Sequence, residues 1–110
     1  MKIKNIISAL EGEILTEKNN FETEIKNCYT GDLLSHVMVN CKEESAWITV
    51  QTHINIIAIA TLLDIPLIIV PENAKVDKNT IVKANEEEIS IVNTKLNAFE
   101  ISVKLKELYS

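Results

Sequence analysis

Arginine is absent from this 110-residue chain, in which all 11 basic residues are lysine. Guanidinium groups make the forked hydrogen bonds with which many proteins hold phosphates and guanine bases, so that mode of recognition is excluded. The formal net charge of −5 also argues against binding to nucleic acid, because an acidic surface repels nucleic-acid phosphates. We therefore expect no nucleic-acid partner.

Glycine is also scarce, since the chain has only Gly12 and Gly31. Phosphate-binding loops of the P-loop type and of the dinucleotide-binding type need several glycines close together, because the backbone must approach the phosphates closely. Two distant glycines cannot form such a loop, and a nucleotide-kinase core is therefore excluded.

Cysteine and histidine are too few and too scattered for a recognisable catalytic or metal motif. Cys28 and Cys41 lack a CxxC arrangement, and His36 and His53 lie in no GxSxG or Cys/His context. We expect no catalytic residues, no metal site and no cofactor, and two reduced thiols in a cytoplasmic protein.

Long apolar runs are missing as well. A membrane span needs about 18 consecutive apolar residues, and the run over residues 54–63 ends at Asp64. The opening MKIKNIISALEGEIL has no continuous apolar core followed by a cleavage site, so it does not resemble a signal peptide. The sequence predicts a soluble protein with no membrane partner.

The apolar residues of the chain are mostly aliphatic, because 46% of all residues are hydrophobic and only 5% are aromatic. This composition favours the Ile-, Leu- and Val-rich layers of a parallel sheet covered by helices. The length suits one domain, which we expect to occupy residues 1–110.

Apolar periodicity predicts alternating helices and strands. The expected helices cover residues 3–10, 32–42, 53–63 (opening at Thr52 or His53), 77–88 and 96–108, and the expected strands cover residues 13–16, 25–30, 47–50, 67–70 and 89–92. Gly12 is expected to close the first helix in a left-handed conformation, Asp32 and Asp77 to cap later helices, and residues 17–20 to form a polar turn.

These elements predict a single three-layer α/β domain with a mostly parallel sheet of about five strands, flanked by helices. The strands over residues 47–50, 67–70 and 89–92 are apolar on both faces, which indicates helical cover on both sides. The strand over residues 25–30 has polar interruptions and suits an edge position.

Polar residues follow the predicted strands, where parallel α/β proteins gather their ligands. The candidate ligand-binding residues are Asp32, Ser35, Gln51, Thr52, His53 and Thr94. If the strands pair as predicted, these side chains share one edge of the sheet and could form a polar cleft. The alternative is that they serve only as ordinary caps and turns.

Two predicted helices are more apolar than one buried stripe requires, those over residues 53–63 and 96–108. A domain of this size has little interior in which to hide both, and large apolar patches are rare on monomers. We therefore expect a homo-oligomer.

The segments GDLLSHVM and AWITVQTH, followed by an Ile/Ala-rich helix, resemble the small stand-alone DRTGG-domain proteins of anaerobic bacteria. The resemblance runs from KIKNIISALEGEILT to NTKLNAFEISVKLKELY. DRTGG domains are similar to the amino-terminal domain of HPr kinase/phosphorylase, and they occur beside CBS domain pairs and within long phosphate acetyltransferases. This resemblance implies an accessory or regulatory module.

One segment departs from the family pattern. Relatives tend to have a glycine-rich turn after the fourth strand, whereas this chain has Pro71, Glu72, Asn73 and Ala74 there. The departure argues against a backbone-mediated anion contact at that turn. The residues that the resemblance supports as ligand or partner contacts are Asp32, Ser35, Gln51, Thr52 and His53.

The sequence thus predicts a non-catalytic regulatory or sensing module that binds a small anionic or nucleotide-like ligand at the carboxyl ends of its strands and self-associates. The alternative is a protein-interaction subunit of a larger redox or phosphotransfer assembly, without a small ligand. A third interpretation is an enzyme that acts through Asp32 and His53.

Overall fold

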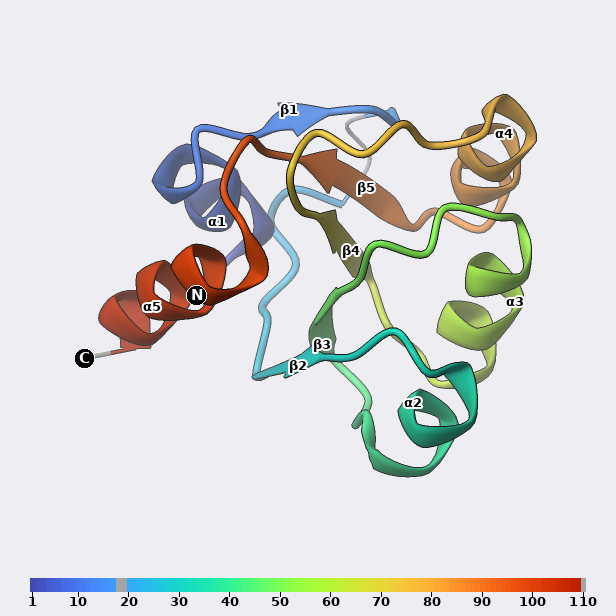
Figure 1. Cartoon of the computed structure of the whole chain (residues 1–110), viewed down its shortest axis with the longest axis horizontal. Coiled ribbons are helices and arrows are strands. Elements are labelled where there is room, and N and C mark those ends of the chain that lie inside the picture. The colour runs from blue at the N-terminus through green and yellow to red at the C-terminus, as the bar shows by residue number, and fades with distance from the viewer. Residues whose placement is uncertain (18–19, 110) are drawn as a thin grey trace.

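The computed structural model describes residues 1–17 and 20–109, and these residues form five helices and five strands around one sheet (Figure 1). The helices are α1 (Ile3–Ala9), α2 (Leu34–Asn40), α3 (Asn55–Leu62), α4 (Lys78–Glu86) and α5 (Ala98–Tyr109). The strands are β1 (Glu13–Ile14), β2 (Asn27–Thr30), β3 (Ser45–Ile48), β4 (Leu67–Val70) and β5 (Ser90–Asn93). Part of the polar turn predicted over residues 17–20 lies outside the described residues.

The strand order in the sheet is β1-β5-β4-β3-β2. Strands β2 to β5 are parallel, and each pairs with its successor in the chain. The short β1 pairs antiparallel with β5, so that Glu13 lies opposite Asn93. The predicted mostly parallel, five-stranded sheet is confirmed. The half-polar β2 lies at one edge, as its sequence indicates.

Helices cover both faces of the sheet, which confirms the predicted α/β class. Side chains from α2, α3 and α4 pack with one buried cluster, and side chains from α1 and α5 pack with the other (Figure 1). Successive residues of β3 alternate between the clusters, because strand side chains point to opposite faces. Trp47 belongs to the first cluster, whereas Ala46 and Ile48 belong to the second.

The largest core side chain, Trp47, fixes the end of β2. Its indole Nε1 is buried and donates a hydrogen bond to the Gly31 carbonyl oxygen at 2.9 Å, which satisfies the indole N–H. Gly31 also leaves room for the Tyr29 ring, because a Cβ atom on it would lie 2.9 Å from that ring and the ring would have to move. The segment after β2 therefore begins at a fixed position.

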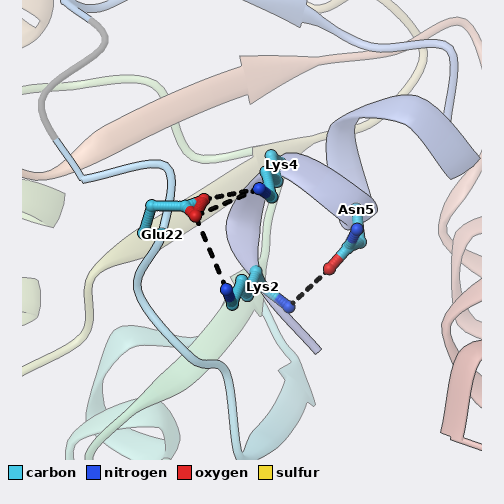
Figure 2. A network of polar contacts seen from close by, with 4 residues as sticks. All are labelled: Lys2, Lys4, Asn5 and Glu22. Atoms are coloured by element: carbon cyan, nitrogen blue, oxygen red, sulfur yellow. Dashed lines mark hydrogen bonds and ion pairs between the residues drawn. The ribbon is translucent and has the colours of Figure 1, made fainter.

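The N-terminal helix is attached to the loop before β2 by exposed polar contacts (Figure 2). The Glu22 carboxylate of this loop lies 2.7 Å from Lys4 Nζ and 3.5 Å from Lys2 Nζ. Within the start of α1, the Lys2 backbone N–H donates to Asn5 Oδ1 at 3.0 Å. The hydrogen bond from Lys4 lowers the pKa of Glu22. Exposed ion pairs contribute little stability, so these contacts orient α1 while its buried apolar face holds it.

The end of α1 differs from the prediction. Glu11, not Gly12, takes the left-handed conformation, with φ 49°. Gly12 is needed for another reason: a Cβ atom there would lie 2.5 Å from Val92 Cγ1 on β5. Close approach of the chain to the sheet, rather than backbone handedness, therefore explains this glycine.

Acidic residues also take the left-handed position at the ends of α3 and α4. Asp64 has φ 56° and Glu88 has φ 57°. After α3, the Ile65 N–H donates to the Ala60 carbonyl and the Asp64 N–H to the Thr61 carbonyl, the pair of bonds of a Schellman motif. Glycine usually occupies this position because side-chain-bearing residues are strained there.

Replacing Asp64 by glycine should therefore stabilise the fold. The left-handed residue loses its strain, while the unfolded chain gains some freedom, and we expect Asp64→Gly to raise the free energy of unfolding by about 0.5–1 kcal/mol. Urea denaturation measures this change. Lys104→Gly, at an exposed position inside α5, should lower stability by about 1 kcal/mol. A loss of stability in Asp64→Gly would contradict the strain argument.

Candidate functional site

The carboxyl ends of β2, β3, β4 and β5 lie at one edge of the sheet, because these strands are parallel and adjacent. The antiparallel β1 begins at the same edge, which brings the end of α1 there too. The segments after the four parallel strands therefore meet along one rim, as the sequence predicts.

Asp32 links the segments that follow β2 and β3. Its Oδ1 atom accepts hydrogen bonds from Thr49 Oγ1 at 2.7 Å and from the Val50 N–H at 2.8 Å. The predicted capping role is wrong, since the N-cap of α2 is Leu33. The parallel register explains the difference, because it places the end of β3 within reach of the Asp32 carboxylate.

Gln51 reinforces this link from the other side. Its Nε2 atom donates to the Asp32 carbonyl oxygen at 2.9 Å, and its backbone N–H donates to Thr49 Oγ1 at 3.1 Å. The two exit segments thus hold one another through side-chain and backbone bonds. Asp32 and Gln51, which the sequence placed in one group, do lie together.

The segment after β3 is also tied to the start of α4. His53 Nδ1 lies 2.9 Å from Asp77 Oδ2, and the Thr52 carbonyl accepts from Thr80 Oγ1 at 2.8 Å. Asp77 is the N-cap residue of α4, but its carboxylate contacts His53 and makes no capping hydrogen bond. Of the predicted group, Thr52 therefore contributes its backbone and His53 its side chain.

Asp32, Gln51 and His53 each have one side-chain atom that is free to make a further hydrogen bond. Among the described residues, no partner contacts Asp32 Oδ2, Gln51 Oε1 or His53 Nε2. Ser35 is exposed at the second position of α2. Three exposed apolar side chains come from the same segments: Leu33, Val50 and Ile54. We call Asp32, Gln51 and His53, with these three apolar residues, the β2–β3 rim.

Thr94, the remaining predicted residue, lies apart from the β2–β3 rim, because β4 separates β5 from β3. Its side chain is only 2% exposed, and its Oγ1 donates to the Leu10 carbonyl at 2.8 Å while accepting from the Leu96 N–H at 3.3 Å. This hydroxyl joins the end of α1 to the segment after β5.

The turn after β4 keeps a left-handed backbone without glycine. Glu72 has φ 57° and Asn73 has φ 50°. Their backbone N–H groups donate to the Leu96 and Thr94 carbonyls at 2.9 Å and 2.8 Å. Both N–H groups are therefore engaged within the protein rather than directed at an anion.

A polar depression of about 300 Å³ lies beside this turn. Its lining residues are Glu11, Glu13, Asn73, Asn93, Thr94 and Lys95. The sequence pattern marked the residues that follow β4 and β5, but it did not indicate Glu11 and Glu13. A two-residue strand carries no signal for its direction, and only the antiparallel pairing of β1 brings these two carboxylates to the edge.

Two further depressions lie elsewhere. One of about 320 Å³ lies at the opposite edge of the sheet, against the ends of α3 and α4. The other, of about 240 Å³, is a mostly apolar groove between β2 and α5 that contains Cys28 and Tyr109. Burial raises the pKa of the Cys28 thiol, and burial with the neighbouring thiol raises the pKa of Tyr109 to about 12.

The described part of the chain contains no group of three His, Cys, Asp or Glu side chains placed to hold a metal ion. Within the same residues, no helix combines the length and the apolar character that crossing a membrane requires.

This geometry defines an α/β module whose parallel strands deliver their polar segments to one rim. Residues 5–108 match the DRTGG domain, and the chain belongs to this family, as its sequence resemblance suggested. The similarity to the amino-terminal domain of HPr kinase/phosphorylase stays a prediction. No curated protein matches the chain.

A solved structure with the same fold is the regulatory region of the Clostridium perfringens pyrophosphatase, which contains CBS and DRTGG domains and is complexed with its activator, diadenosine tetraphosphate. The two share 19% sequence identity with a TM-score of 0.77, and the similarity covers 94% of this chain and 45% of that one. The chain therefore corresponds to somewhat less than half of that regulatory region.

The buried Thr94 hydroxyl should be important for stability. Thr94→Val leaves the Leu10 carbonyl and the Leu96 N–H without this partner, and we expect the free energy of unfolding to fall by about 1–3 kcal/mol. Thr94→Ser, which keeps the hydroxyl, should lose less. Urea denaturation of both variants tests this expectation. A loss in Thr94→Ser as large as that in Thr94→Val would contradict it, because the methyl group would then contribute as much as the hydrogen bonds.

Proposed function

We propose that this protein is a non-catalytic regulatory module that binds a small nucleotide-like ligand at the β2–β3 rim. Its membership of the DRTGG family supports a regulatory role, as does its structural similarity to part of a regulatory region solved with a nucleotide activator. The contacts at the rim support the position of the site.

The observation that carries the proposal is that the polar side chains of the rim are held in place yet incompletely used. Asp32, Gln51 and His53 each employ one side-chain atom in an internal hydrogen bond and keep a second atom for another partner. Side chains fixed in this way lose little conformational freedom on binding, which favours affinity.

The available atoms suit the sugar and base of a nucleotide better than its phosphates. Asp32 Oδ2 and Gln51 Oε1 are acceptors, and a carboxylate at such a strand end commonly binds ribose hydroxyls. The exposed Leu33 and Val50 offer apolar contact to a base. Without arginine, His53 Nε2 is the rim atom that could donate to a phosphate.

The same contacts favour binding over catalysis. The side-chain partner of His53 is the Asp77 carboxylate, and neither thiol belongs to the rim: Cys28 lies on β2, and Cys41 is buried after α2. Nucleophilic catalysis needs a base beside a hydroxyl or thiol. His53 has no such neighbour in the contacts of the described residues.

A thermal-shift experiment tests the proposal with diadenosine tetraphosphate, adenosine monophosphate and adenosine as probes. A ligand that binds only the folded state adds about 2.7 kcal/mol at 100 times its dissociation constant, so the melting temperature should rise with concentration. Adenosine should retain part of the effect if the sugar and base provide the main contacts.

Asp32→Asn is the decisive variant for this site. The amide oxygen can keep the bonds from Thr49 and Val50 while an NH₂ group replaces Oδ2, so we expect the protein to fold and bind about tenfold more weakly. Asp64→Asn makes the same chemical change at the opposite edge and should bind normally. Absence of any shift with all three probes, or equal binding by both variants, would refute the proposed site.

A second candidate function is a protein-interaction subunit that self-associates, and exposed apolar side chains favour it. Phe99 is 76% exposed, and Val103 lies one turn further along α5, also exposed. Residues four apart lie on the same side of a helix, so these two form an apolar stripe. On α2, Val39 is 82% exposed.

Self-association through α5 should be abolished by a charge on this stripe. We expect the wild-type chain to be a homo-oligomer by multi-angle light scattering and Val103→Glu to be a monomer, because an unpaired charge is costly in an apolar interface. Val82→Glu introduces the same change on α4, on the opposite face of the sheet, and should leave the oligomer intact. A monomeric wild-type chain would contradict this candidate.

A further inference from the structure

The helices that follow β4 and β5 lie on opposite faces of the sheet. The segment after β4 leads to α4, which packs with one buried cluster, whereas the segment after β5 leads to α5, which packs with the other (Figure 1). In open α/β sheets, ligands bind where successive connections diverge in this way. Strands β2, β3 and β4 all lead to helices on one face, so this divergence occurs once in the parallel run.

The polar depression of about 300 Å³ lies at this divergence. It is bordered by the turn after β4, the segment after β5 and the start of β1. Pockets of roughly this volume are at the lower limit of those that hold small molecules. Topology and surface shape therefore indicate the same place.

The polar groups around the depression differ from those at the β2–β3 rim. The side chains of Glu11, Glu13, Asn73, Asn93 and Lys95 have no hydrogen-bond or ion-pair partner among the described residues. Two carboxylates, two amides and one ammonium group thus surround one small space without compensating each other, and all can make new bonds to a ligand.

Two residues that line the depression have a left-handed backbone conformation. Asn73 and Glu11 border the depression with left-handed φ angles of 50° and 49°. Glu11 takes this conformation at the end of α1, and Asn73 takes it in the turn after β4. The Asn73 side chain places an amide in the wall of the depression.

We propose that this depression is a binding site for a small zwitterion of the amino-acid class. Glu11 and Glu13 would accept hydrogen bonds from the ligand's ammonium group, and Lys95 would donate to its carboxylate. The amides of Asn73 and Asn93 can both donate and accept, and so can bind either group or a polar side chain. The mixture of charges disfavours a purely anionic or purely cationic ligand.

The site is separate from the one at the β2–β3 rim and does not depend on it. Its lining comes from the turn between α1 and β1, from β1, from β5 with the segment after it, and from the turn after β4. None of these contributes to the Asp32, Gln51 and His53 group. Binding at one site can therefore be lost without loss of the other.

Two-dimensional ¹H–¹⁵N NMR of the full chain tests the proposal. The probes are the twenty free L-amino acids at millimolar concentration, followed by the N-acetyl and the carboxamide derivatives of any that bind. We expect at least one amino acid to shift the side-chain NH₂ resonances of Asn73 and Asn93. Each derivative, which lacks one of the two charges, should bind at least about tenfold more weakly.

Two glycine variants separate binding from folding. Both Asn73→Gly and Glu72→Gly relieve a left-handed residue and should raise the melting temperature. Only Asn73 lines the depression, so Asn73→Gly should weaken amino-acid binding about tenfold while Glu72→Gly leaves it unchanged. Lys95→Gln should weaken binding of the amino acid more than binding of its carboxamide.

The outcomes distinguish the alternatives. Absence of any shift with all twenty amino acids would overturn the proposal, and so would binding that is unchanged in both Asn73→Gly and Lys95→Gln. Equal binding of the free amino acid and its N-acetyl derivative would overturn the zwitterion class. Adenosine-probe binding by Asn73→Gly should match the wild type, so failure at one site is not mistaken for failure at the other.

Discussion

The structure depends on the pairing of four consecutive parallel strands, each beside its successor in the chain. Because the strands are parallel, each connection runs back over the sheet from the carboxyl end of one strand to the amino end of the next. The helices α2, α3 and α4 in these connections all lie on one face. All four exit segments then lie along one rim, where backbone and side-chain bonds join them in pairs. Asp32 joins the first two, His53 and Asp77 the next, and the turn at Glu72 the last.

The α/β class, the element order and the mostly parallel sheet were predictable because aliphatic periodicity and turn residues are local signals. Strand β4 was located to the residue, since prolines flank its apolar run. The direction of β1 was not predictable, because two residues give no pattern. The role of Asp32 was also missed, since a carboxylate before a helix suggests a cap, while its actual partners come from a neighbouring strand. That partnership depends on register, which the sequence does not reveal.

Scarcity of glycine shapes the ends of the helices as well as the possible ligands. Three Schellman-type helix ends use Glu11, Asp64 and Glu88, and the turn after β4 uses Glu72 and Asn73, where glycine would be less strained. Acidic residues at helix C-termini are also unfavourable with respect to the helix dipole. These residues therefore lower stability at several positions. They also place carboxylate and amide side chains at both ends of the strands.

The pairing of Glu13 with Asn93 has a consequence for the order of folding. The contacts from β2 to β5 each close a short loop, so they can form one after another along the chain with little entropic cost. The β1–β5 contact instead joins segments near the two ends of the described chain, so closing it costs more entropy unless the strands β2 to β5 have already paired. The docking of α1 and β1 should therefore be the late step that makes the folding transition cooperative.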